Sequence, residues 1–197
     1  MRLPESWTER LPILEALEEN WDPVPKAALA AWLIFYSLFL YQAARGQGIL
    51  LLMDGVFVPI HEGGHLLFRM FGEFVSVAGG TILQLLVPIL LGTYFLIHRQ
   101  AQGVAFCFFF MFEQLLPIST YMADARAQEL PLLTIGDAEY VIHDWNYLFG
   151  KLGVLDQDIQ IAGFLRLVGW LGMITVVLWL LWRGVHDVAP AKNALER

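Results

Sequence analysis

The sequence has little cysteine and little charge. Its 197 residues include one cysteine, Cys107, so the chain cannot build a disulfide framework or a cysteine-rich zinc site. Only 16% of the residues are charged, and the formal net charge of −7 gives no indication of a nucleic-acid partner. Residues 1–25 also lack the basic start and apolar core of a secretory signal peptide.

Apolar residues are in excess instead. They make up 57% of the chain, against ~45–50% in an ordinary soluble domain. Five apolar runs approach or exceed the ~20 residues needed to cross a bilayer: 27–44, 49–71, 75–97, 103–122 and 161–182. We therefore predict a single multi-pass integral membrane domain over residues 1–197, in contact with membrane lipids. The lysines and arginines divide too evenly between the loops to orient it.

The predicted fold is all-α, a polytopic helical bundle of about five spans. Residues 1–25 are expected to hold an amphipathic surface helix, which docks on the protein because its polar face is acidic. Residues 26–123 hold four spans, residues 124–160 form a polar helical lid, and residues 161–197 hold the last span and a tail. Gly55 and Pro59 are expected to break or kink the second span.

The most specific motif lies inside the second apolar run and reads His61-Glu62-Gly63-Gly64-His65. Residues four apart share one face of a helix, so the two imidazoles can bind one Zn²⁺. Glu62 is then placed to act as general base on a water. Such a motif also arises by chance, but three ionisable residues are costly in hydrocarbon, which favours a metal site.

Catalytic zinc usually takes a third protein ligand. Asp124, at the end of the fourth span, is the preferred candidate, ahead of His143 in the lid. Asp144 is a weaker alternative. His143 could equally serve as a helix cap or hydrogen-bonding group. Gln84, in the third span, is expected to hydrogen-bond a neighbouring helix.

Asp54 shares the helical face of the first histidine. It could support a metal ligand, or it could be a polar residue beside a helix break.

These motifs resemble the site-2-protease family of intramembrane zinc metalloproteases. That family carries H-E-x-G-H in a span, then a glycine-containing element with an Asn, where this chain has Gln84. A later Asn-Leu-Leu-Pro-like run leads to the Asp that binds zinc; the similar run at 114–117 leads to Asp124. The chain departs from the family because Asp124 is followed by Ala125 and not by glycine, and the gap before it is longer.

The resemblance implies a protease that hydrolyses peptide bonds of membrane-embedded peptide or protein substrates. Glu62 would be the base, and Gln84 would help zinc to stabilise the oxyanion. The alternative is a membrane zinc protein that is not a protease, such as an assembly or binding factor or another hydrolase. Membrane di-iron enzymes are less favoured, since five histidines with one such box are too few.

Overall fold

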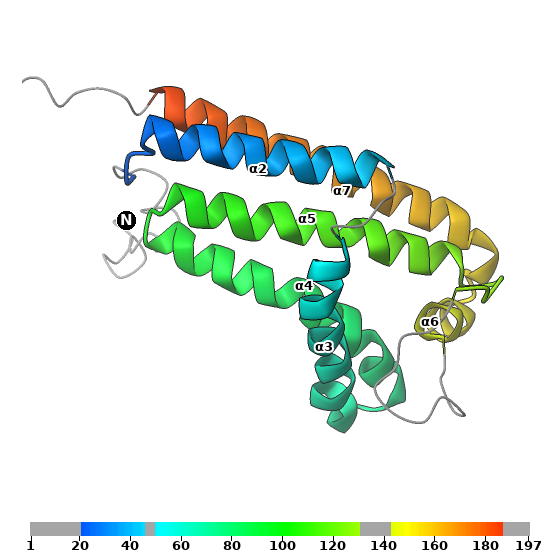
Figure 1. Cartoon of the computed structure of the whole chain (residues 1–197). Coiled ribbons are helices and arrows are strands. Elements are labelled where there is room, and N and C mark those ends of the chain that lie inside the picture. The colour runs from blue at the N-terminus through cyan, green and yellow to red at the C-terminus, as the bar shows by residue number, and fades with distance from the viewer. Residues whose placement is uncertain (1–20, 46–49, 131–142, 187–197) are drawn as a thin grey trace, which may run out of the picture.

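The computed structural model describes residues 21–45, 50–130 and 143–186, with the backbone alone at 50–54. Within these ranges it contains six α-helices, two 3₁₀ turns and no strand, which confirms the all-α class. Most of the predicted N-terminal amphipathic helix and residues 131–142 of the predicted lid lie outside this description. The elements are α2 (Lys26–Arg45), α3 (Leu50–Phe68), η2 (Arg69–Phe71), α4 (Glu73–Ile97), α5 (Ala101–Ala123), α6 (Asp144–Leu152), η4 (Leu155–Gln157) and α7 (Asp158–His186) (Figure 1).

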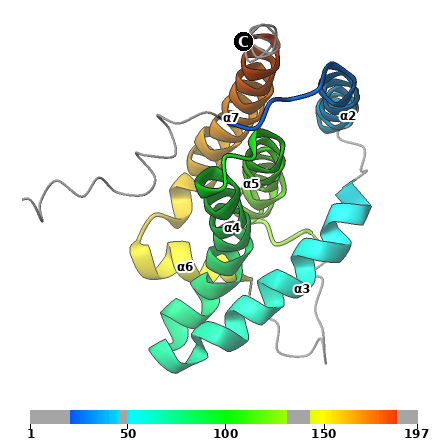
Figure 2. The ribbon, with the colours of Figure 1, turned by 90° about the vertical axis from the view of Figure 1, so that its left-hand side faces the viewer.

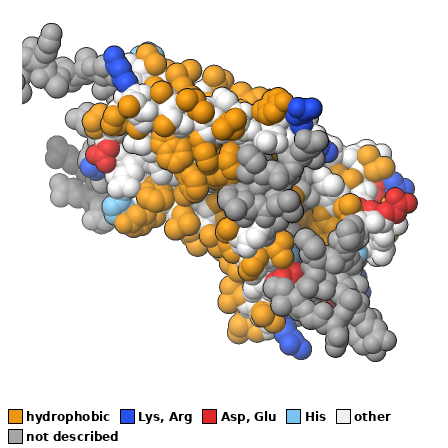
Figure 3. All heavy atoms as spheres, in the orientation of Figure 1, with side chains coloured by type: hydrophobic (Ala, Val, Ile, Leu, Met, Phe, Trp, Pro, Cys, Tyr) orange, Lys and Arg blue, Asp and Glu red, His pale blue; other side chains and the backbone are white. Residues whose placement is uncertain are grey.

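Four helical segments of the described chain are long and apolar enough to cross a membrane. They are α2, α4, α5 and the continuous stretch Leu155–His186, and they match four of the five predicted spans. On the face in Figure 3, hydrophobic side chains cover the middle of the long helices, and charged side chains lie toward the ends. The protein is therefore a multi-pass membrane protein, with a last helix longer than its predicted span.

The second predicted span differs from the other four. Its residues form α3 and the 3₁₀ turn η2, and α3 is not among the four membrane-crossing segments. Of the two predicted alternatives, a break or a kink, the break does not occur, because α3 continues through Pro59. Pro59 removes one N–H from the helical ladder and leaves the carbonyl of Gly55 without its usual donor, yet the turns on either side keep the helix. The side chain of Asp54 lies outside the described atoms.

Helix α5 is the centre of the bundle. Over the apolar stretch that is long enough to cross a membrane, 61% of the α5 residues are buried inside the protein, against 17–28% for the other three segments. It packs between α4 and α7, while α2 lies beside α7 and α3 lies against α4 (Figure 2). Tyr36 of α2 and Phe109 of α5 are fully buried, with ring centroids 4.4 Å apart.

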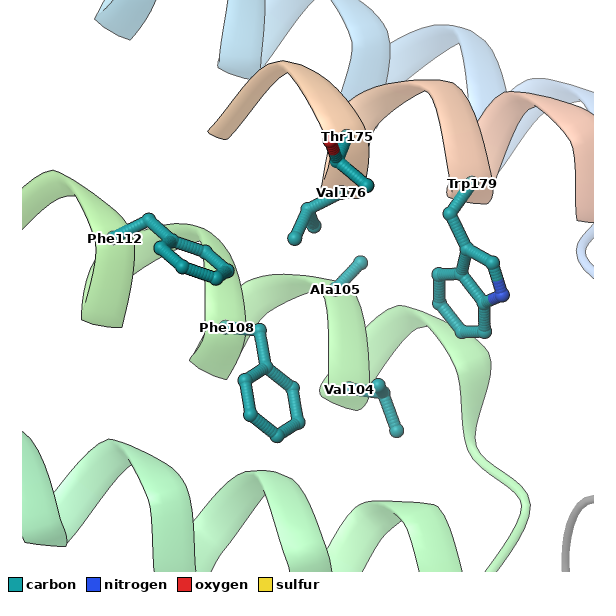
Figure 4. Close-up of a pocket in the computed structure, with 7 residues that line it drawn as sticks. All are labelled: Val104, Ala105, Phe108, Phe112, Thr175, Val176 and Trp179. Atoms are coloured by element: carbon teal, nitrogen blue, oxygen red, sulfur yellow. The ribbon is translucent and has the colours of Figure 1, made fainter. Parts of the chain in front are cut away.

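A small apolar pocket of about 210 Å³ lies between α5 and α7 (Figure 4). None of its lining residues is titratable: they are Val104, Ala105, Phe108, Phe112, Thr175, Val176 and Trp179. The hydroxyl of Thr175 donates to the carbonyl of Leu171 in its own helix. The pocket therefore offers space for apolar groups and no chemistry.

Helix α6 closes the end of the bundle where α5 ends and α7 begins (Figure 1). Phe149 of α6 is buried with Ile118 and Met122 of α5 and with Ala162 of α7. This packing anchors the described part of the predicted lid, and it places the first residue of α6 beside α3 and α4.

Candidate metal centre

The two histidines of the motif share one face of α3, as their spacing predicts. Their rings lie edge to face, with centroids 4.7 Å apart. His61 Nδ1 is 3.0 Å from the side-chain oxygen of Gln84, and His65 Nδ1 is 2.9 Å from the backbone carbonyl of Ser76. An amide oxygen facing Nδ1 requires the proton on that nitrogen. Each Nδ1 therefore carries a proton, and the Nε2 atom of each ring lies on the opposite edge of the ring.

The group that both Nε2 atoms face is the carboxylate of Asp144. Its Oδ2 lies 3.0 Å from His61 Nε2 and 3.4 Å from His65 Nε2. Asp144 is the first residue of α6, where His143 accepts a hydrogen bond from Asn146 N as the helix cap. The backbone N–H of Asp144 donates to the hydroxyl of Tyr121 at 3.1 Å. Two contacts outside the carboxylate thus fix where it lies.

Asp144 is 8% exposed as a whole residue, so its carboxylate has lost most of its contact with water. Burial raises the pKa of Asp144, but the hydrogen bonds from His61 and His65 outweigh burial and hold the pKa below its ordinary value. The favoured state is therefore a carboxylate, which is the form that binds a cation.

Glycines create the space in front of the imidazoles. A Cβ added to Gly80 of α4 would lie 2.6 Å from His61 Nε2 and 2.7 Å from His65 Nε2. A Cβ added to Gly64 of α3 would collide with the backbone carbonyl of Gly79. The two helices can cross this closely because neither carries a side chain there, and Gly80 lies directly against both ligand nitrogens.

We call His61, His65 and Asp144 the ligand triad. One ligand atom from each lies within 4.8 Å of the others, and in the described residues these three form the one cluster of this kind. Ligands of a tetrahedral zinc ion at ~2.0–2.2 Å lie about 3.3–3.6 Å apart, close to the distances from Asp144 to the imidazoles. Two imidazole nitrogens and one carboxylate oxygen match catalytic zinc sites, which leave a further position open. The residues therefore fit a bound metal ion.

The two leading candidates for the third ligand lie elsewhere. Asp124 accepts hydrogen bonds from Glu129 N at 2.9 Å and from Leu130 N at 3.1 Å, so its carboxylate holds the turn after α5. His143 is buried, and its Nε2 faces Asp124 at 3.4 Å. The structure brings the weaker candidate, Asp144, to the imidazoles and keeps Asp124 and His143 as a pair behind it.

The signal that favours Asp144 is local. His143 is followed by a short sequence with the apolar spacing of a helix, and an acidic residue at the first position of a helix is held in place by the cap. Which helix this carboxylate meets depends on tertiary packing, which the sequence does not display.

Gln84 makes the interhelical hydrogen bond expected of a polar residue in a span. Its Nε2 donates to Gln114 Oε1 of α5 at 2.6 Å, and its oxygen faces His61. Both ends of the amide are engaged, one with Gln114 and the other with Nδ1 of His61, whereas Asp144 faces the other ring nitrogen of His61. This position suits a residue that orients a ligand.

Glu62 follows His61 on α3 and is half-buried. Its charge acts on His65 of the triad and on Tyr121 of α5. The motif carboxylate is therefore near enough to His65 for an electrostatic interaction.

Comparisons of the chain with family models, with curated proteins and with solved structures find no match.

Proposed function

We propose that the protein is an intramembrane zinc metalloprotease in which His61, His65 and Asp144 hold the ion and Glu62 is the general base. The observation that carries the proposal is the triad itself. Three ligand atoms converge where α3 crosses α4 at Gly80, and α3 also carries Glu62. The resemblance of the H-E-x-x-H motif to site-2 proteases supports the same reading.

The chemistry follows from the side chains. A zinc ion in the triad would polarise a peptide carbonyl and lower the pKa of a water towards ~7. Glu62 accepts the proton of the attacking water and returns it to the leaving amine. Asp144 neutralises charge at the site, and Gln84 and Ser76 hold the two imidazoles in the orientation that presents Nε2.

The surroundings support a substrate that comes from the membrane. Side chains of α3 near the triad are exposed and apolar, including Val56, Leu66 and Leu67. They would face lipid, or a peptide segment arriving through it. The proposed substrate class is therefore a membrane-embedded or membrane-adjacent polypeptide.

A zinc protein without protease activity is the competing function. A fourth protein ligand would favour it, because structural zinc sites are closed. In the described residues the cluster stops at three ligands, and this supports a catalytic site over a structural one.

The test uses the full chain purified in detergent. We expect about one zinc per chain, and cleavage of a peptide library reconstituted into vesicles. Glu62→Gln should keep the zinc and lose at least ~100-fold in cleavage, in the range of a positioned general base. Glu129→Gln, at an exposed acid, is the matched control and should remain active. Zinc without cleavage in the unaltered protein would favour the competing function, and undiminished cleavage by Glu62→Gln would exclude the mechanism.

A further inference from the structure

A chain of polar side chains leads from His61 into the middle of the bundle. It consists of Gln84, Gln114 and Glu113, and we call it the Gln–Gln–Glu chain. Gln84 donates to Gln114 Oε1 at 2.6 Å, and Gln114 donates to Glu113 Oε2 at 2.7 Å. Together with the contact of His61 to Gln84, it connects α3, α4 and α5.

The acid at the end of this chain is unusual for its location. Glu113 and Gln114 are each 1% exposed, in the most buried of the membrane-length helices. An ionisable side chain within a membrane-spanning helix is costly, and such residues are commonly functional. The proposed proteolytic chemistry gives Glu113 no role.

The chemistry of the chain gives it a direction. A carboxylate accepts hydrogen bonds and does not donate them, so Gln114 must turn its NH₂ group toward Glu113. Its oxygen then faces Gln84, whose NH₂ donates to it, and the oxygen of Gln84 faces His61. An imidazole nitrogen opposite a carbonyl oxygen carries the proton. The carboxylate thus fixes one proton of His61 on Nδ1. In the absence of a metal, Nε2 also carries a proton, because it faces Asp144 Oδ2 at 3.0 Å, and this second proton is the one that a bound cation would replace.

We propose that Glu113 is a positioning residue for the metal centre, which selects through Gln114 and Gln84 the His61 tautomer whose Nε2 can bind an ion. This inference rests on the proposed metal site and adds a determinant of its affinity. Glu113 is not itself a ligand. Its carboxylate acts on the imidazole over three successive hydrogen bonds.

A purely structural role makes a different prediction. If the chain merely satisfies polar groups between α4 and α5, removing the carboxylate lowers stability and leaves the tautomer of His61 unchanged. Placing the carboxylate at position 114, one residue nearer to His61 in the chain of hydrogen bonds, would then have no effect on the tautomer. Under our proposal, a carboxylate at position 114 accepts directly from Gln84 and restores the direction of the chain.

The experiment measures the tautomer directly. Full-length protein with ¹⁵N-labelled histidine is prepared in detergent without metal, in an Asp144→Ala background that removes the competing acceptor at Nε2. The resonances of His61 are assigned by their loss in a His61→Gln protein. We expect neutral His61 to carry its proton on Nδ1, Glu113→Gln to populate both tautomers, and Glu113→Gln combined with Gln114→Glu to restore Nδ1.

Zinc affinity provides the second readout, with Asp144 intact. Glu113→Gln should weaken zinc binding about 10-fold, as loss of an outer-shell partner does, and the double variant should recover most of it. Glu129→Gln is the control at an exposed acid and should change neither readout. Should Glu113→Gln fail to fold, Gln114→Met interrupts the same chain and should mix the tautomers of His61.

Two results would overturn the inference. One is an unchanged Nδ1–H tautomer in whichever of Glu113→Gln and Gln114→Met folds. The other is a mixed tautomer that the double variant does not correct. Failure of the unaltered protein to bind zinc would instead refute the proposed function, and the tautomer measurement, which needs no metal, would still decide the role of Glu113.

Discussion

Two of the helix contacts that depend on glycine serve different ends. Between α5 and α7, Gly169 and Gly172 face Leu115, Leu116 and the ring of Phe112, next to the apolar pocket. These glycines make room for neighbouring side chains, so this contact is packing alone.

Between α3 and α4, the glycines lie against the candidate metal centre. Gly64 and Gly79 bring the backbones into contact, and Gly80 faces the Nε2 atoms of His61 and His65. A side chain at Gly172 would press on an aromatic ring that belongs to the packing. A side chain at Gly80 would occupy the volume in front of two ligand nitrogens. The comparison teaches that a glycine acquires its role from the groups opposite it. The same change, glycine to alanine, should therefore affect zinc binding at one contact and only stability at the other.

The largest effect is expected from Gly80→Ala. The new methyl would lie 2.6–2.7 Å from both Nε2 atoms, so it displaces the imidazoles or excludes the ion. We predict loss of zinc binding by more than about 100-fold, beyond the 10–100-fold typical of outer-shell changes. Zinc titration by competition with a chelating dye checks this. Unaltered affinity would show that the ion, if bound, lies away from Gly80.

Asp144→Asn is expected to come second. The amide keeps the size of the side chain and loses the charge that faces the two imidazoles, so zinc affinity should fall about 100-fold, at the upper end for groups around a metal. Asp156→Asn, an exposed acid nearby, is the control. Equal affinities for the two variants would remove Asp144 from the ligand set.

Asp124→Asn sharpens the choice of third ligand. In the structure this carboxylate accepts from two backbone N–H groups, and an amide oxygen does so more weakly. We expect a loss of stability of about 1–2 kcal/mol, because the two hydrogen bonds remain but lose the extra strength that a charged acceptor gives them, and a change in zinc affinity of less than ~10-fold. A fall as large as that of Asp144→Asn would restore Asp124 as a ligand.

The smallest effect on zinc is expected from Gly172→Ala. The added methyl collides with the ring of Phe112, and such overpacking costs about 1–3 kcal/mol in a well-packed core. Thermal unfolding in detergent should show this loss, while zinc affinity stays the same. Weakened zinc binding here would mean that the α5–α7 contact and the metal centre are coupled, and the comparison between the two contacts would fail.

The parts of this account that the sequence predicts are those with a local cause. Long apolar runs predict the membrane helices, because composition over ~20 residues decides whether a helix can lie in lipid. The spacing of His61 and His65 predicts a shared face, because the helix repeat alone determines it. Gln84 predicts an interhelical hydrogen bond, since an amide in a span needs a partner.

The parts that the sequence misses depend on packing. The sequence favours Asp124 as the third ligand because it lies at the end of an apolar run. In the structure, however, its carboxylate accepts hydrogen bonds from the turn that follows α5. Asp144 reaches the imidazoles because Phe149 anchors α6 against α5 and α7, a contact between segments far apart in the chain. Pro59 suggests a break, and the surrounding turns of α3 override it. The role of Gly80 depends on the crossing of two helices, for which a glycine pair is a weak signal.

The most direct measurement of the central claim is X-ray absorption at the zinc edge, on the purified protein and on its Asp144→Ala variant. The account predicts two imidazole nitrogens near ~2.0–2.1 Å, oxygen ligands at ~2.0–2.2 Å and no sulfur. In the variant, the carboxylate oxygen should be lost while both imidazoles remain. A zinc environment that is identical in the two proteins, or one without a pair of imidazoles, would contradict it.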